Sequence, residues 1–279
     1  MIGMILWQIK ERKHVSYIFY VVIGIIFTFF TYKTIDRNND WDTEKSLFEA
    51  DIKYLENSAK ANGLYATSIL NELAIDPDAL NKKDKIEKAL KHFQKSVQIS
   101  PDYYSSYTNI GYIYLMFYND INGALKYFDL SLNAKKENTA ALFYKGLCYE
   151  RKSNYQEAVK YYSEVLKYNP DDIQALSKMA NWSFKQGDYN KSIEYNGKII
   201  KQQPELDIPF INVGNYFFMS GDTINALKYW EMAYDRNQGN YYMLLNLVNL
   251  YKAVGNLSKY EFYDAKLMEF KMNETDKKK

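Results

Sequence analysis

The chain has 279 residues, of which 47% are hydrophobic, so it is long enough for one or two domains with a large buried core. Its 36 basic and 34 acidic residues leave a net charge of +2. Proteins that bind nucleic acids usually carry a much larger positive charge, so no nucleic-acid partner is predicted. The single cysteine, Cys148, excludes an internal disulfide framework and a cysteine-based zinc site.

An uncharged apolar segment follows an N-terminal flank of residues 1–14. Residues 15–32 read VSYIFYVVIGIIFTFFTY and carry no charge. At ~1.5 Å per residue, a helix of this length spans roughly 27 Å, close to the ~30 Å hydrocarbon core of a bilayer. We therefore predict one transmembrane helix over residues 15–33. The alternative, a cleaved signal peptide, has a shorter apolar core and a small-residue cleavage site.

The basic residues around this segment are distributed unevenly. Lys10, Arg12 and Lys13 cluster before it, whereas those after it are more dispersed. The positive-inside rule then favours a cytoplasmic N-terminus. We expect a single-pass membrane protein whose main domain is extracytoplasmic.

Residues 34–57 form a polar linker followed by a helix that precedes the main domain. That helix is predicted from Thr43 to Asn57, because its apolar residues recur at helical spacing. A second helix is expected over residues 58–73. An irregular insertion over residues 74–85 then contains the turn signal Asp76-Pro77-Asp78.

Small residues recur along the rest of the chain with a period close to 34 residues. One series has spacings of 35, 34, 34 and 34, and its members are Ala89, Ala124, Ala158, Ser192 and Ala226. A second series has spacings of 35, 34 and 34, and its members are Gly111, Gly146, Ala180 and Gly214. Two such series in register are typical of helix–turn–helix repeats, in which small residues let paired helices approach closely.

This pattern resembles the tetratricopeptide repeat (TPR) family over residues 58–272, with about six repeats, of which the first is atypical. The turns at Gly187-Asp188 and Gly221-Asp222 match the family's turn between helices. The resemblance implies an all-α fold, a TPR-type solenoid of helical hairpins with a right-handed superhelical twist. Residues 273–279 are expected to be a polar tail.

In this family the concave groove is lined by the second, fifth, sixth, ninth, twelfth and thirteenth residues of each unit. Asparagine dominates the sixth and ninth positions here, and its amide can both donate to and accept from a peptide backbone. We therefore predict a peptide-binding groove; the alternative is that asparagine is ordinary repeat consensus. The predicted groove residues are Asn109, Tyr112, Tyr144, Asn181, Asn212, Asn215, Asn246 and Asn249.

The family's carboxylate clamp for acidic C-termini is not expected. It needs a lysine at a fifth position and basic residues in a later unit, but the fifth positions include Ser177 and Ile211, and Tyr242 occupies a second position. No catalytic constellation, cofactor motif or metal site is found, so the chain is not predicted to be an enzyme. Asp171-Asp172 is read as a helix cap and Cys148 as a packing residue.

The junction before the repeats also resembles transmembrane, TPR-containing O-mannosyltransferase-like proteins, where the last span joins the C-terminal repeats. The matching residues are Arg37, Asn38, Asp40, Trp41, Ser46, Leu47, Phe48 and residues 58–61. The resemblance implies repeats on the extracytoplasmic side. The many spans and the acidic catalytic motif of those enzymes are absent from this sequence.

We therefore expect a membrane-anchored TPR scaffold that binds a protein or extended peptide in its groove. The alternative is an accessory or truncated C-terminal part of a multi-span, lipid-sugar-dependent glycosyltransferase that binds the acceptor protein. A third interpretation is an assembly factor for an envelope complex.

Overall fold

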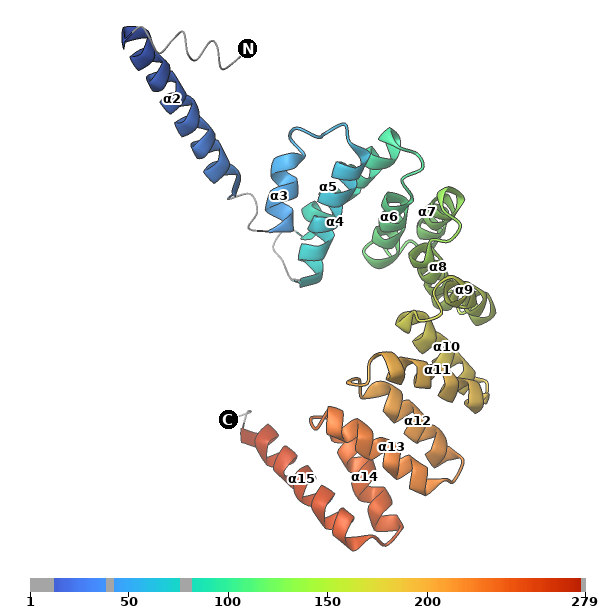
Figure 1. Cartoon of the computed structure of the whole chain (residues 1–279). Helices are drawn as coiled ribbons and strands as arrows, with labels where there is room; N and C mark the ends of the chain where they lie inside the picture. Colours follow the sequence, from blue (N-terminus) through green and yellow to red (C-terminus); the bar gives the residue numbers. More distant parts are fainter. Residues whose placement is uncertain (1–12, 39–42, 76–81, 277–279) are drawn as a thin grey trace. The chain divides into compact units, whose positions relative to one another are not determined.

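The computed structural model describes residues 13–38, 43–75 and 82–276 and divides the chain into two compact units. Fourteen helices and no strand occur in these three ranges, so the fold is an all-helical, TPR-like solenoid of stacked hairpins (Figure 1). The predicted turn at Asp76-Pro77-Asp78 and the junction residues Asp40 and Trp41 lie outside the described residues.

The first unit, residues 1–119, contains the helices α2 to α6. They are α2 (Lys13–Asn38), α3 (Glu44–Asp51), α4 (Ala59–Ile75), α5 (Lys82–Ile99) and α6 (Tyr104–Met116). Helices α4 and α5 form a hairpin, and both α3 and α6 pack against it. Helix α3 covers the predicted pre-repeat segment only in part, because the chain leaves the helix at Ile52.

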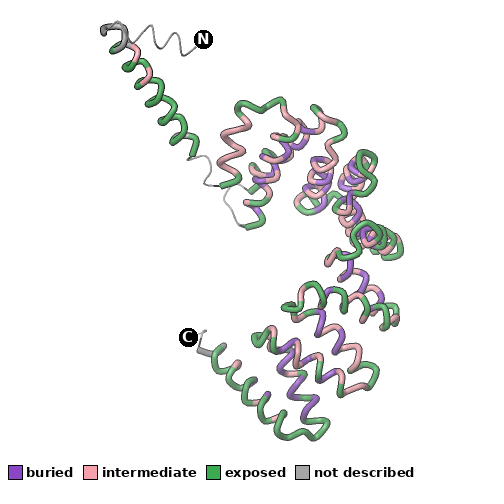
Figure 2. The backbone as a smooth tube through the Cα atoms, viewed as in Figure 1, coloured by how far each residue is buried: buried purple, intermediate pink, exposed green. Residues whose placement is uncertain are grey.

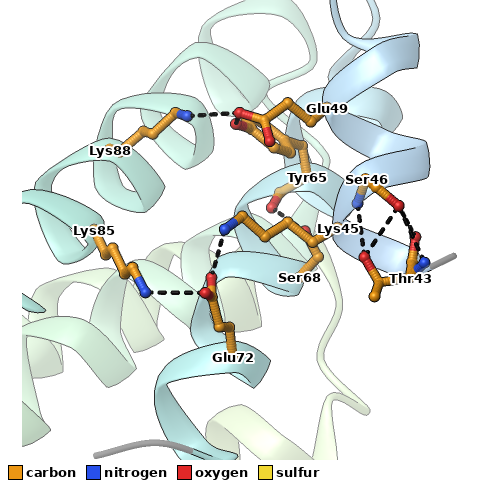
Figure 3. Close-up of polar contacts among 9 residues, drawn as sticks. All are labelled: Thr43, Lys45, Ser46, Glu49, Tyr65, Ser68, Glu72, Lys85 and Lys88. Atoms are coloured by element: carbon orange, nitrogen blue, oxygen red, sulfur yellow. Dashed lines mark hydrogen bonds and ion pairs between the residues drawn. The ribbon is translucent and has the colours of Figure 1, made fainter. Parts of the chain in front are cut away.

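Helix α3 has no fully buried residue, and polar contacts attach it to this hairpin. Glu49 accepts a hydrogen bond from the Tyr65 hydroxyl at 2.9 Å and pairs with Lys88 at 3.2 Å (Figure 3). Glu72 on α4 pairs with Lys45 and with Lys85, each at 2.9 Å. Two carboxylates thus join three helices.

The second unit, residues 120–279, stacks four hairpins behind a single helix. The first helix, α7 (Ile121–Ala134), packs against the first hairpin, and each hairpin packs against the next. The hairpins are α8 (Thr139–Arg151) with α9 (Tyr155–Tyr168), α10 (Ile173–Lys185) with α11 (Tyr189–Gln202), α12 (Ile208–Met219) with α13 (Thr223–Arg236), and α14 (Tyr241–Ala253) with α15 (Leu257–Asp276). Figure 2 shows the buried residues along the inner faces of these helices.

Glycine on the first helix of a hairpin makes room for an aromatic ring on the second. A Cβ added at Gly146 would lie 2.6 Å from the Tyr162 ring, and one at Gly214 would lie 2.6 Å from the indole nitrogen of Trp230. Both rings are buried. Close approach of the paired helices therefore depends on the missing side chain, as the small-residue series predicted.

The turns within hairpins use a left-handed residue followed by a capping side chain. The left-handed residues are Gly187, Gly221, Gly255 and Ser153, with φ values of 77°, 81°, 74° and 59°. Asp188 and Asp222 then accept hydrogen bonds from the backbone amides of Lys191 and Asn225 at 3.3 and 3.0 Å. These contacts confirm the predicted Gly-Asp turns and satisfy amides that the helix leaves unpaired.

Ser153 occupies a backbone conformation that favours glycine. We expect Ser153→Gly to raise the free energy of unfolding by about 0.5–1 kcal/mol, because relief of the left-handed strain exceeds the entropy that glycine adds to the unfolded chain. Urea unfolding followed by circular dichroism measures the change. Ser153→Ala keeps the Cβ and should give no gain; an equal gain from both substitutions would contradict the explanation.

Helix α2 does not support the predicted transmembrane helix over residues 15–33. Among the described residues, no helix combines the length and hydropathy that a membrane span requires. The prediction rested on the lack of charge, but tyrosine, threonine and glycine interrupt the apolar run. The Thr28 hydroxyl bonds to the Gly24 carbonyl at 2.8 Å, while large apolar side chains such as Phe27 and Phe30 are exposed.

The last helix is longer than the sequence pattern predicted. Helix α15 continues to Asp276, so residues 273–276, expected in the polar tail, are helical. Polar residues do not by themselves end a helix, and neither glycine nor proline, the two strong helix breakers, occurs in this segment. The loss of the repeat consensus in the last unit therefore did not mark the end of the helix.

Candidate functional site

A row of polar side chains runs along one face of α10 in the second unit. Gln174, Lys178, Asn181 and Lys185 follow the spacing i, i+4, i+7 and i+11, which places them on the same side of a helix. Gln174, Asn181 and Lys185 are exposed, and Lys178 is partly exposed. We call this set the α10 stripe; it lies beside two clefts.

The first cleft, here the Trp182 cleft, has a volume of about 200 Å³. Tyr155 and Trp182 stack at its edge with ring centroids 5.7 Å apart, and the Lys185 ammonium lies 5.7 Å from the Tyr155 ring. The cleft combines apolar walls with cationic and amide groups. Its lining comprises Glu150, Tyr155, Ala158, Val159, Tyr162, Lys178, Asn181, Trp182, Phe184 and Lys185.

A three-residue polar network lines this cleft. Glu150 Oε2 accepts a hydrogen bond from the Tyr162 hydroxyl at 2.7 Å and pairs with the Lys178 ammonium at 2.8 Å. Burial opposes ionisation of Glu150, but the hydrogen bonds from Lys178 and Tyr162 outweigh it, so the pKa of this carboxyl lies below its ordinary value. Burial and the bond to Glu150 raise the pKa of Tyr162. At neutral pH the network is therefore a carboxylate held by a neutral phenol and an ammonium.

A smaller pocket of about 60 Å³ adjoins the Trp182 cleft, since Asn181 and Phe184 line both. Asn212 and Asn215 also line it, but each already has a partner inside the unit. The Asn212 amide donates to Asn196 at 3.2 Å, and the Asn215 carbonyl accepts from the Trp230 indole at 3.1 Å. Asn212 keeps its side-chain oxygen and Asn215 its amide group for a ligand.

The second cleft, here the Asp171 cleft, has a volume of about 440 Å³. Tyr144 stacks on Phe128 with ring centroids 5.8 Å apart. Asp172 accepts a hydrogen bond from the backbone amide of Ala175 at 2.9 Å, which confirms its predicted capping role; Asp171 is exposed and caps nothing. The lining comprises Thr139, Ala140, Phe143, Tyr144, Asn169, Asp171, Asp172, Ile173 and Gln174.

The eight predicted groove residues are therefore only partly brought together. Asn181, Asn212 and Asn215 share one pocket, and Tyr144 lines the Asp171 cleft. Asn246 and Asn249 are exposed on α14. The other two belong to the first unit: Asn109, whose amide donates to the Thr67 hydroxyl at 3.4 Å, and Tyr112, whose ring contacts Phe117.

Four residues that line the Trp182 cleft were not predicted from the sequence: Glu150, Tyr155, Trp182 and Lys185. Glu150 and Lys185 occupy the twelfth and thirteenth positions of their repeats, which belong to the groove set of the family, so the repeat register was a usable signal for both. Tyr155 begins a second helix, outside those positions. Its place in the cleft follows only from how α9 packs beside α10.

Cys148 is fully buried, as expected for a packing residue. Burial raises the pKa of its thiol to about 11, against the opposing influence of Arg151 and Lys152. We expect Ellman's reagent to react slowly with the native protein at pH 8 and rapidly after addition of guanidinium chloride, because the reactive thiolate is both scarce and inaccessible in the folded state. Rapid stoichiometric labelling of the native protein would contradict this account.

Comparisons with known proteins agree with the repeat architecture. Residues 139–172, which comprise α8, α9 and the following turn, match the tetratricopeptide repeat family model. Protein O-mannosyl-transferase TMTC3 of Mus musculus is 28% identical over 109 residues, which is 39% of this chain and 11% of that protein. The human protein of the same name matches equally well, so the chain spans about a tenth of the length of these curated relatives.

Several solved structures have similar folds. YrrB, described as a TPR protein with an unusual peptide-binding site, has a TM-score of 0.52 and 18% identity, covering 71% of this chain and 96% of its own. PilF of Pseudomonas aeruginosa has a TM-score of 0.60 and 15% identity, covering 78% and 98%. The predicted resemblance to tetratricopeptide repeats and to TPR-containing O-mannosyltransferases is confirmed.

Proposed function

We propose that the chain is a protein-interaction scaffold whose second unit binds an extended peptide segment of a partner protein along the α10 stripe. The observation that carries the proposal is the pair of clefts joined by this stripe. Phe143 lines the Asp171 cleft, and its ring lies 5.5 Å from that of Tyr162, which lines the Trp182 cleft. The two clefts are therefore neighbours on one surface.

The chemistry of this surface suits a peptide backbone. Asn181 is exposed and lines both the Trp182 cleft and the smaller pocket beside it. Its amide can donate to one peptide carbonyl while its oxygen accepts from one peptide amide. The partly exposed rings of Trp182 and Phe184 beside it offer apolar contact to alternate side chains of an extended segment. YrrB, which has a similar fold, is described as having a peptide-binding site of its own.

Selection from a random dodecapeptide phage library on the detergent-solubilised full chain tests this function. We expect enriched peptides whose affinity falls about three- to tenfold in Asn181→Ala, the loss that one or two hydrogen bonds produce. The matched control is Asn190→Ala, which removes an exposed asparagine amide on α11 outside both clefts. Failure to enrich any peptide, or an equal loss in both variants, would contradict the proposal.

We infer further that α2 attaches the scaffold to a membrane. Its exposed apolar side chains do not form a single face, since Val21, Val22, Ile25, Ile26 and Phe27 point in all directions around the helix. A helix that is apolar all round suits a lipid or protein interior better than water. We expect the full chain to float with liposomes and Ile25→Asp/Phe29→Asp to remain in the dense fraction.

The control for flotation is Ile224→Asp/Leu257→Asp, which places the same charges at exposed apolar positions of the second unit. This control should float like the unaltered chain. Flotation of all three proteins, or of none, would exclude the attachment through α2.

A second candidate function is an accessory part of a lipid-sugar-dependent glycosyltransferase that binds the acceptor protein. The partial match to Protein O-mannosyl-transferase TMTC3 favours it. It predicts a gene for a multi-span membrane protein beside the gene for this chain. Absence of such a neighbour across related genomes would remove the support for this alternative.

A further inference from the structure

The two clefts along the α10 stripe carry charges of opposite sign. The Trp182 cleft contains the ammonium groups of Lys178 and Lys185 and the single carboxylate of Glu150, a net charge of +1. The Asp171 cleft contains two carboxylates, Asp171 and Asp172, and no basic residue. The surface is therefore electrically polar along the length of α10.

The helix ends do not cancel this difference. The N-terminus of α10 contributes about +0.5 charge beside the Asp171 cleft, against two negative charges. At the other end, the C-termini of α8 and α10 each contribute about −0.5 charge, and the N-terminus of α9, where Tyr155 begins the helix, offsets one of them, so the side-chain charge of +1 is reduced but not cancelled. One cleft thus remains negative and the other positive.

One group in each cleft has its charge available for a ligand. Glu150 is already paired with Lys178 at 2.8 Å, but Lys185 forms no ion pair within residues 13–38, 43–75 and 82–276. Asp171 is exposed and likewise pairs with no basic side chain in those ranges. A bound peptide can therefore add a counter-charge at each end without breaking an ion pair.

The length of α10 sets the spacing between the Asp171 cleft and Lys185. Gln174, at the Asp171 cleft, and Lys185 are eleven residues apart, which corresponds to roughly 16 Å at 1.5 Å per residue. An extended peptide rises about 3.3 Å per residue, so about five residues span this distance.

We propose, on the basis of the proposed function, that the preferred partner segment is an extended bipolar peptide. Its basic residue lies at the Asp171 cleft, its acidic residue about five positions away lies at Lys185, and apolar or aromatic side chains between them contact Phe143 and Trp182. The recognised element is an internal segment with two opposite charges and needs no free C-terminus.

Fluorescence polarisation with designed nonapeptides tests this proposal on the full chain in detergent. All peptides are acetylated, amidated and fluorescein-labelled and share a central valine and phenylalanine. In the bipolar peptide a lysine and a glutamate are five positions apart; in the others this pair is two glutamines, two lysines or two glutamates. We expect the bipolar peptide to bind about three- to tenfold more tightly than the glutamine peptide.

Charge reversal supplies the decisive arm. Lys185→Glu should weaken binding of the bipolar peptide about threefold or more and tighten binding of the dilysine peptide by a similar factor. Asp171→Lys should weaken the bipolar peptide and favour the diglutamate peptide. The control, Lys201→Glu, makes the same charge change on α11 outside both clefts and should alter neither affinity.

The outcomes separate the two proposals. If library peptides bind and depend on Asn181, but the four designed peptides bind equally or ignore the reversals, the bipolar preference is wrong and the peptide-binding function stands. If neither library nor designed peptides bind, both proposals fail. Exchange of preference between the bipolar and dilysine peptides in Lys185→Glu supports the bipolar segment.

Discussion

Gly214→Ala is expected to lower the free energy of unfolding of the second unit by about 1–2 kcal/mol. The added methyl group would lie 2.6 Å from the indole nitrogen of Trp230, a ring that is only 3% exposed. The ring is also fixed by its hydrogen bond to Asn215 at 3.1 Å, so it cannot move aside without losing that bond. Overpacking costs about 1–3 kcal/mol, and better helix propensity of alanine returns about 0.5–1 kcal/mol.

Gly197→Ala is the matched control, because Gly197 lies inside α11 with no heavy atom within 4 Å of an added Cβ. This substitution should stabilise the unit by about 0.5–1 kcal/mol through helix propensity alone. Urea unfolding followed by circular dichroism measures both variants. Stabilisation of similar size in both would show that Gly214 is not a close-packing residue.

Glu231→Leu is expected to destabilise the C-terminal hairpin by about 2–3 kcal/mol. Glu231 Oε1 accepts hydrogen bonds from Tyr251, Tyr263 and Lys259 at 2.7, 3.1 and 2.6 Å. Without this carboxylate two buried phenol groups lose their acceptor, and each unsatisfied group costs about 1–3 kcal/mol where water cannot replace it. Glu231→Gln keeps an acceptor oxygen and should cost about 1 kcal/mol.

The contribution of Glu231 should also depend on pH. Burial raises the pKa of this carboxyl, but hydrogen bonds from Lys259, Tyr251 and Tyr263 outweigh it, so the folded-state pKa lies below the ordinary value. Its stabilisation is therefore complete above the ordinary value of about 4.3 and is lost as pH falls through the folded-state pKa. The stability difference between the unaltered protein and Glu231→Gln should stay constant from pH 7 to 5 and shrink below about pH 4.

The control for this series is Glu261→Gln, which changes an exposed carboxylate on α15. It should alter stability by less than about 0.5 kcal/mol at every pH. A pH-independent difference between the unaltered protein and Glu231→Gln would contradict the assigned role. The same arrangement of tyrosine, glutamate and lysine recurs at Glu150 and Glu49, so the result bears on all three sites.

The hairpins could be predicted because their determinants are local. Gly146 and Gly214 are members of a series that repeats once per hairpin, and Gly187-Asp188 contains both the left-handed residue and the cap of its turn. The end of α15 was not predictable from repeat consensus, because consensus residues report packing between helices, and no glycine or proline in residues 273–276 marks where the helix stops. The division of the chain into two units coincides with only a one-residue difference in the small-residue series, a spacing of 35 instead of 34, which is too small to predict it.

The binding surface was predictable only in part. Repeat register placed Asn181 at a groove position, and its side chain is exposed and lines a cleft; that it binds a peptide stays a prediction. It could not show that Asn212 and Asn215 bond to Asn196 and Trp230, because those partners lie on the neighbouring second helices. Side-chain competition of this kind depends on three-dimensional packing that a spacing pattern does not contain.

Site-directed photo-crosslinking tests the central claim most directly. Benzoylphenylalanine introduced at position 181 would lie in the Trp182 cleft, whereas the same group at position 190 would lie outside both clefts. Upon irradiation we expect a library-selected peptide to become attached to the protein from position 181 and not from position 190, with attachment competed by excess unlabelled peptide. Equal attachment from both positions, or attachment from position 190 alone, would contradict peptide binding along the α10 stripe.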